Sequence, residues 1–201
     1  MLQRLPLPLL RDEPWANGAG TSTVLAVGPD AQAWQWRISI ARVVRAADFS
    51  NYADTLRQMT PLDGRLHLHF SNASTPAVLH LDRLQVARFD GGVAPRASLP
   101  DGSTRVFNLM TRADAAATLT LLARPLVGAL LLPEASRWFV HVLTGHAELR
   151  QVSDERLDLQ AGDSAWATGA NRISGHGEVV LVRFDALQSA PVSTASTASG
   201  A

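Results

Sequence analysis

Short runs of alternating apolar and polar residues recur along the chain, and the clearest run begins at Trp36. Every second residue of a β-strand points to the same side, so alternation separates an apolar face from a polar face. The apolar row is Trp36, Ile38 and Ile40, and the polar row is Arg37, Ser39 and Ala41. A second extended segment from Thr55 to Leu62 contains Arg57 and ends at Asp63-Gly64. Two arginines on neighbouring extended segments, with aromatic residues between them, predict a walled pocket for an anionic or planar molecule.

The remaining pattern predicts further short strands separated by turn signals. Expected strands are Leu2–Leu10 at a sheet edge, Thr21–Val27, Gly64–Phe70, Ala77–Phe89 (one or two strands), Arg105–Met110, Leu119–Leu132 with bends at Pro125 and Gly128, and Glu178–Phe184. A single short helix is expected over Ala113–Ala117. Many short strands with turn signals every ~8–12 residues indicate an all-β sandwich or barrel.

The second half of the chain repeats the first in outline. Trp138–Gly145 is laid out like Arg57–Gly64, and an alternating strand follows each of them. The Gly-x-x-x-Leu…Leu-x-Gly-Asp rhythm of the second half is typical of cupin barrels. We therefore expect a first barrel over residues 1–115 and a second over 116–188, with terminal strands crossing between them. The small-residue segment 189–201 is expected to be a disordered tail.

Composition narrows the classes of function. The 18 basic residues balance the 18 acidic ones, which disfavours a nucleic-acid partner. All the basic residues are arginine, so the abundance of arginine says nothing about function, and a role for any one arginine depends on its position. The chain has no cysteine, which excludes disulfides, thiolate metal sites and cysteine nucleophiles. Prolines interrupt the apolar N-terminus, and no run of ~18 apolar residues occurs, so a soluble cytoplasmic protein without a membrane partner is expected.

The histidine pair His67 and His69, with His80 further on, resembles a cupin metal site. Alternation places both histidines on one face, as ligation requires. However, the opposite face, Leu66, Leu68 and Phe70, is apolar and belongs in a barrel core, which directs the histidines outward. The glutamate expected a few residues later is also missing. We therefore predict no metal and no cofactor.

Two arginines and two asparagines are the polar candidates for binding a ligand. The guanidinium groups of Arg37 and Arg57 match the geometry of a carboxylate; the alternative is a structural ion pair, for instance to Asp48 or Asp54. Asn17 and Asn108 suit a small polar metabolite, although Asn17 before a glycine can simply cap a tight turn. The aromatic residues Trp15, Trp36, Phe49, Tyr52 and Phe107 can line an apolar pocket or belong to the core. Ser39 and Ser50 have no accompanying His and acid pattern, which disfavours nucleophilic catalysis.

Several motifs together resemble the HutD/Ves family. They are Pro14-Trp15-Ala16-Asn17-Gly18-Ala19-Gly20-Thr21, Trp36-Arg37-Ile38-Ser39-Ile40-Ala41, Asp48-Phe49-Ser50, Phe89-Asp90-Gly91 and Phe107-Asn108-Leu109-Met110-Thr111-Arg112. The likeness extends over roughly residues 3–187. It implies a bicupin, with two small β-barrels in one chain, that forms a homodimer. It also implies an association with histidine utilisation, as a sensor of a pathway metabolite rather than a catalyst.

The resemblance and the residues together predict one pocket in the first barrel for a carboxylated metabolite such as urocanate or formylated glutamate. The predicted ligand-binding residues are Trp15, Asn17, Thr21, Trp36, Arg37, Ser39, Phe49, Ser50, Arg57, Phe107 and Asn108. Two alternatives stay open: a cupin-type enzyme, either an isomerase or a metal-dependent oxygenase, and a stress-related interaction protein with a vestigial pocket.

The chain departs from the family pattern in three places. Val106 stands where the pattern has an aspartate before Phe-Asn, so a carboxylate is missing. Asp54 stands where a glycine ends the F-S-x-F-P-G motif. Ala19 replaces the middle glycine of the first turn. The missing carboxylate predicts a different ligand or weaker binding, because it would pair with an arginine or with a ligand amine.

Overall fold

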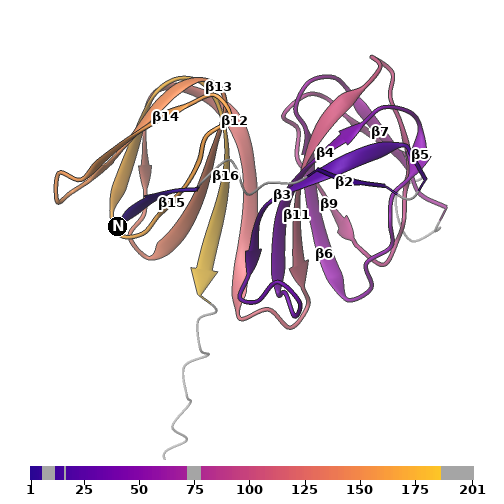
Figure 1. Cartoon of the computed structure of the whole chain (residues 1–201), viewed down its shortest axis with the longest axis horizontal. Coiled ribbons are helices and arrows are strands. Elements are labelled where there is room, and N and C mark those ends of the chain that lie inside the picture. The colour runs from indigo at the N-terminus through magenta and orange to yellow at the C-terminus, as the bar shows by residue number, and fades with distance from the viewer. Residues whose placement is uncertain (6–11, 16, 72–77, 187–201) are drawn as a thin grey trace, which may run out of the picture.

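The computed structural model describes residues 1–5, 12–15, 17–71 and 78–186, and all regular structure among them is β. The strands form two lobes that lie side by side (Figure 1). The first lobe contains β2 (Asp12–Pro14), β3 (Gly20–Gly28), β4 (Trp36–Val43), β5 (Ala47–Asp48), β6 (Thr55–Pro61), β7 (Leu66–His69), β8 (Val78–Leu81), β9 (Ala87–Asp90), β10 (Arg96–Ser98) and β11 (Thr104–Arg112). The second lobe contains β1 (Leu2–Arg4), β12 (Ala117–Leu132), β13 (Ser136–Gln151), β14 (Arg156–Gln160), β15 (Ser164–Ala167) and β16 (Asn171–Ala186).

The prediction of an all-β fold is confirmed, but the predicted helix over Ala113–Ala117 is wrong. The amide of Ala113 donates to the carbonyl of Asp54 at 2.9 Å, and Ala115 closes a turn onto Arg112. Strand β12 already begins at Ala117. Five residues form too short a segment to offset the cost of helix nucleation, and a tertiary hydrogen bond outweighs the local propensity.

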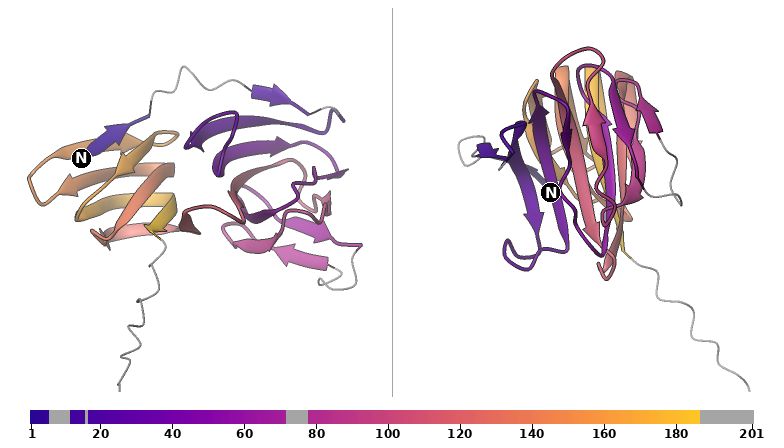
Figure 2. Two further views of the ribbon diagram at one scale, coloured as in Figure 1. Left: turned by 90° about the horizontal axis from the view of Figure 1, so that it is seen from below. Right: turned by 90° about the vertical axis from the view of Figure 1, so that its right-hand side faces the viewer.

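Sheet order explains how distant segments meet. The first lobe has a six-stranded sheet, β2-β3-β4-β11-β6-β9, and a four-stranded sheet, β5-β10-β7-β8. The second lobe has the order β1-β15-β13-β16-β12, with β14 paired to β13. Strand β1 is therefore an edge strand that lies on the second lobe, although it precedes the first lobe in sequence (Figure 2). The predicted barrel boundary at 115/116 falls between β11 and β12; residues 6–11 and the predicted tail 189–201 lie outside the described residues.

Three apolar clusters hold the lobes. One fills the first lobe, with Val43, Phe49, Met59, Leu66, Leu68, Phe70, Leu81, Ala87, Phe89, Ala97 and Val106. A second fills the second lobe, with residues such as Val140, Leu149, Leu159 and Ile173. The third, which we call the interlobe cluster, joins the two sheets that face each other and includes Ile38, Phe107, Leu109, Leu121, Phe139, Trp166, Val182 and Phe184. The apolar row of β4 packs against this third cluster, as the alternation predicts.

A buried glutamine connects the lobes. Gln58 of β6 is 2% exposed, and its Nε2 donates to the carbonyl of Leu119 at 2.7 Å. Its Oε1 accepts from the amide of Leu121 at 3.0 Å and from Nε of Arg88 at 3.1 Å. The side-chain amide of Gln58 therefore forms the hydrogen bonds that a neighbouring strand would form along this edge of β12. Without it, the carbonyl of Leu119 and the amide of Leu121 would be buried next to the interlobe cluster without a partner. In the described part of the chain, no helix is long and apolar enough to cross a membrane.

Candidate functional site

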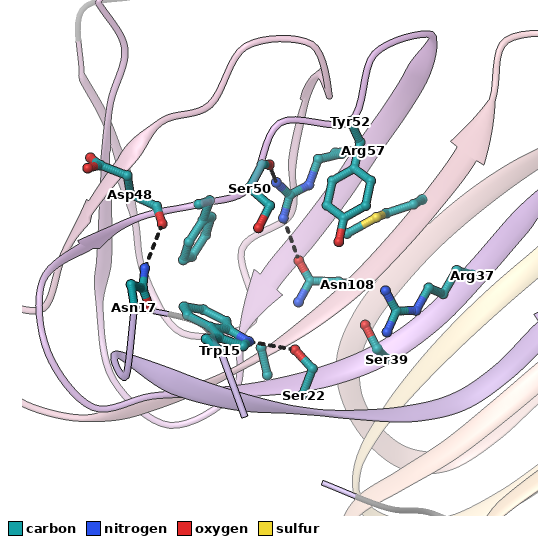
Figure 3. A pocket seen from close by; sticks show the side chains of 13 residues that line it. Trp15, Asn17, Ser22, Arg37, Ser39, Asp48, Ser50, Tyr52, Arg57 and Asn108 are labelled. Atoms are coloured by element: carbon teal, nitrogen blue, oxygen red, sulfur yellow. Dashed lines mark hydrogen bonds between the residues drawn. The ribbon is translucent and has the colours of Figure 1, made fainter. Parts of the chain in front are cut away.

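A cavity of about 220 Å³ opens inside the first lobe (Figure 3). It is lined by Trp15, Asn17, Ser22, Arg37, Ser39, Ala41, Asp48, Phe49, Ser50, Tyr52, Arg57, Asn108 and Met110. Strands β4 and β11 form the floor, because Ser39 pairs in register with Asn108 and Arg37 with Met110. The alternation that sends Ile38 into the interlobe cluster turns Arg37, Ser39 and Ala41 into this cavity. The polar row of the sequence is therefore a cavity wall.

Arg57 is the most deeply buried charge in the cavity, with 4% of its surface exposed. Its Nη1 donates to the carbonyl of Ser50 and its Nη2 to Oδ1 of Asn108, each at 3.2 Å. Its Nε is buried without a hydrogen-bond partner. Among the described residues, no carboxylate lies within ion-pair distance of this guanidinium. Arg57 is thus a buried cation whose hydrogen-bond partners within the described chain are neutral.

Aromatic rings surround the Arg57 guanidinium. Its central carbon lies 5.5 Å from the ring centre of Phe49, 5.7 Å from that of Tyr52 and 5.4 Å from that of Phe89. Burial lowers the pKa of the guanidinium to about 10, and the nearby Tyr52 phenol opposes this shift. The group therefore remains charged at neutral pH. A cation held among rings in a partly dry cavity attracts an anion more strongly than an exposed cation does.

Arg37, the second guanidinium of the cavity, is ion-paired at its outer end. Its Nη2 lies 3.1 Å from Oε2 of Glu13 on β2, and the Glu13 side chain is 63% exposed. The sequence suggested Asp48 or Asp54 as structural partners for these arginines. Asp48 instead lies 3.3 Å from Nη1 of Arg96, in an exposed pair on the rim.

The turn that contributes Trp15 and Asn17 is held by its own hydrogen bonds. Oδ1 of Asn17 accepts from the amide of Ala19 at 3.0 Å, and Gly18 adopts a φ of +64°. A Cβ at Gly20 would lie 2.3 Å from the carbonyl oxygen of Arg42, so only glycine permits this approach of β3 to β4. Asn17 therefore performs the turn-capping role that was one of its two predicted roles, while Nε1 of Trp15 donates to Ser22 at 2.8 Å.

The structure brings most of the predicted ligand-binding residues into one cavity. Trp15, Asn17, Arg37, Ser39, Phe49, Ser50, Arg57 and Asn108 line it. Trp36 and Phe107 do not, because each precedes a cavity residue on its strand and so packs on the opposite face, against the interlobe cluster. Thr21 lies on β3 beside Arg42 of β4, outside the cavity lining. The binding roles themselves stay predictions.

The structure adds cavity residues outside the predicted ligand-binding set: Ser22, Ala41, Asp48, Tyr52 and Met110. Ala41 and Met110 each lie two residues after a predicted cavity residue, Ser39 and Asn108, so strand alternation alone places them on the cavity face. Val106 also follows this alternation, and it is fully buried in the core of the first lobe. An apolar side chain thus fills the position where the family pattern has a carboxylate.

The histidines of β7 point away from the core, as predicted. Leu66, Leu68 and Phe70 are buried in the first lobe, whereas His69 is exposed and its Nε2 lies 2.9 Å from Oγ of Ser98. The His67 ring lies 4.2 Å from that of its cross-strand partner His80. Across the described residues, no three His, Cys, Asp or Glu side chains gather in a group that could hold a metal ion.

Comparison with known proteins gives a consistent result. The model of the family described as HutD matches residues 9–181. Protein Ves of Escherichia fergusonii is 32% identical over 117 residues, which make up 56% of this chain and 56% of that protein. The chain thus spans little more than half the length of the curated relative that it matches.

Solved structures cover more of the chain. A conserved protein of unknown function from Pseudomonas aeruginosa is 26% identical, with a TM-score of 0.80 over 92% of this chain and 100% of its own. HutD from Pseudomonas fluorescens is 18% identical, with a TM-score of 0.75 over 92% of this chain and 99% of its own. Cupin-fold proteins are thus the structural neighbours, and the predicted bicupin fold is confirmed.

Proposed function

Because the chain belongs to the HutD family, we propose that it is a non-catalytic regulator that binds a small carboxylated metabolite in the cavity of the first lobe. Candidate ligands are metabolites of histidine breakdown such as urocanate or formylglutamate. In this proposal the carboxylate lies against Arg57 and the aromatic rings contact the rest of the ligand. The chain would act through ligand occupancy, and we propose that it does so as a homodimer.

The buried guanidinium of Arg57 is the observation that carries the proposal. A buried charge without a countercharge is costly, and a cation whose own hydrogen-bond partners are neutral is therefore suited to an incoming anion. A carboxylate accepts two parallel N–H bonds from a guanidinium, which gives orientation as well as attraction. Asn108 holds one Nη at 3.2 Å and so fixes the plane of this group.

Two further features support a small organic acid as the ligand. The cavity of about 220 Å³ has room for a molecule of a few carbon atoms beside the arginine, and Phe49 and Tyr52 give it apolar walls. No histidine is among the described lining residues, so Ser39 and Ser50 lack the histidine base that usually activates a nucleophilic serine.

Calorimetric titration with urocanate, formylglutamate and acetate tests the proposal. We expect at least one of the two metabolites to bind at millimolar concentration or below. Arg57→Met, which keeps an unbranched stem as far as the position of Nε and removes the charge, should weaken binding by about 30-fold or more, because a buried charged contact contributes at least ~2 kcal/mol.

Arg150→Gln is the matched control, because it removes an arginine from an exposed ion pair with Asp154 in the second lobe. It should leave the dissociation constant within about twofold. Absence of binding by all three acids at millimolar concentration would refute the proposed ligand class.

A further inference from the structure

Two exposed histidines face each other on the outer surface of the second lobe. His146 of β13 and His176 of β16 lie directly opposite in antiparallel register, and their ring centres are 4.4 Å apart with the ring planes at 89°. Directly opposed residues of an antiparallel pair have Cβ atoms about 5 Å apart. Two imidazole rings at this spacing can therefore contact the same small partner.

Glycines beside these histidines bring the two strands close together. A Cβ at Gly145 would lie 2.1 Å from the carbonyl oxygen of His176, and a Cβ at Gly175 would lie 2.3 Å from that of His146. Both glycines also have positive φ, 74° and 146°, which residues with side chains rarely adopt. The backbone thus sets the positions of the two histidines, and only their side chains need to rotate to meet a shared partner.

The spacing of the rings suits two nitrogen ligands of one metal ion. Zn²⁺ binds histidine nitrogens at about 2.0–2.1 Å, so two such nitrogens on a tetrahedral ion lie roughly 3.4 Å apart. Rings with centres 4.4 Å apart can reach this separation by rotation about χ2, which is a soft torsion in histidine. Imidazole is a favourable ligand for Zn²⁺, Cu²⁺ and Ni²⁺.

Two carboxylates lie in the next row of the same face. Glu148 follows His146 by two residues on β13, and it lies opposite Asp158 of β14. Alternation directs both side chains to the side of the sheet that carries the histidines. Within the described residues, neither carboxylate has an ion-pair partner. Two like charges in opposed positions repel each other, so they favour a cation nearby.

A directly opposed histidine pair of the first lobe lies in more cationic surroundings. The rings of His67 and His80 are 4.2 Å apart. Burial, and next the charges of His80, Arg65 and His69, lower the pKa of His67, while Asp101 opposes the shift. The arginine and the third histidine oppose a further cation there, whereas the two carboxylates favour one at the second-lobe pair.

We propose that His146 and His176 together bind one divalent transition-metal ion of the Zn²⁺ type on the outside of the second lobe. In the described part of the chain, no third His, Cys, Asp or Glu completes a three-ligand group, so water fills the remaining coordination positions. The ion links β13 to β16 where the glycines bring them together. The prediction of no metal was argued from His67 and His69, and it did not consider this pair.

Calorimetric titration with ZnCl₂ tests this proposal, on the full chain without a purification tag and in a buffer that does not bind Zn²⁺. We expect the second-lobe pair to bind one equivalent at micromolar concentration. His146→Gln should weaken this binding by about tenfold or more, because loss of a group that merely orients a ligand already costs ~10–100-fold. His80→Gln breaks the first-lobe pair; it is the matched control and should leave the dissociation constant within about twofold.

Side-chain NMR identifies the histidines that bind the ion. The imidazole signals of His146 and His176 should shift together as Zn²⁺ is added, and those of His67 and His80 should not. Zinc affinity that is unchanged in His146→Gln, shifts confined to the first-lobe histidines, or no binding at millimolar Zn²⁺ would each overturn the proposal. Thermal unfolding of each variant reports whether it is folded.

Discussion

Arg57 and Asn108 lie on neighbouring strands of the first-lobe sheet, and Nη2 of the arginine donates to Oδ1 of the asparagine at 3.2 Å. A neutral oxygen therefore occupies the place beside this guanidinium where many buried arginines have a carboxylate. The contact leaves the positive charge available to an anion from outside the chain. Whether residue 108 is an amide or a carboxylate therefore decides whether the oxygen beside Arg57 is neutral or anionic.

Replacing that amide with a carboxylate should close the site. Asn108→Asp places an internal anion beside Arg57, so a ligand carboxylate meets a neutralised partner and a like charge. We expect binding to weaken by more than tenfold, measured by calorimetry with the best ligand. Folding stability should change little, because a buried ion pair gains about as much attraction as it loses in hydration. Unchanged affinity in a folded Asn108→Asp protein would show that Arg57 does not bind the ligand.

The buried His141 should make the free energy of unfolding fall at acidic pH. Burial, and next the charge of Arg105, lower the pKa of this histidine to about 4, while Asp163 opposes the shift; its Nδ1 lies 2.9 Å from Oγ of Ser164. The unfolded chain binds a proton near pH 6.5 that the folded chain does not, so stability falls as the pH drops from 6.5 to 4 and this loss ends below pH 4. The loss amounts to about 3 kcal/mol.

Denaturant unfolding of wild type and His141→Gln between pH 7 and pH 4 measures this term. The carboxylates of the protein titrate equally in both chains, so the difference between them isolates the histidine. The wild type should lose more stability than the variant over this interval. Parallel curves would show that the pKa of His141 is the same in the folded and the unfolded chain.

A glycine in place of Asp54 should stabilise the protein. It adopts a φ of +55°, a conformation that glycine accepts without strain, and the family pattern has a glycine at this position. Asp54→Gly should raise the free energy of unfolding by about 0.5–1 kcal/mol. Asp54→Ala removes the same carboxylate but keeps the Cβ, and it should bring no such gain. Equal effects of the two substitutions would assign the change to the charge instead of the backbone.

Removing the hydrogen bonds of Gln58 should weaken the connection between the lobes. Gln58→Leu keeps a similar volume but leaves the amide of Leu121 and the carbonyl of Leu119 buried without partners. Each such group costs about 1–3 kcal/mol, so we expect a loss of about 2–6 kcal/mol in denaturant unfolding. Gln160→Leu, at an exposed position of β14, should cost less than about 0.5 kcal/mol. A loss as small as the control's would mean that water or a shifted strand replaces the glutamine.

The alternation of residue types was sufficient for much of the fold. It predicted most of the longer strands, the apolar and polar faces of β4, and the outward direction of His67 and His69, because side chains on a strand alternate by geometry alone. It did not predict the short strands β2, β5 and β10. It did not predict the turn at Ala113–Ala115, since a long-range bond to Asp54 decides that conformation. The same geometry also explains why Trp36 and Phe107 do not share a cavity with their neighbours Arg37 and Asn108.

The sequence by itself determined which residues lie on the same face of a strand. The tertiary structure decided which other elements each face contacts. The polar face of β4 was evident from Arg37, Ser39 and Ala41, and a pocket shared with Arg57 was predicted, but only the tertiary structure showed that β11 lies between β4 and β6. Which arginine has a carboxylate partner depends on the pairing of β2 with β3, which brings Glu13 to Arg37 and not to Arg57. Charge pairing is set by distances across strands far apart in the chain, and a linear pattern contains no such distances.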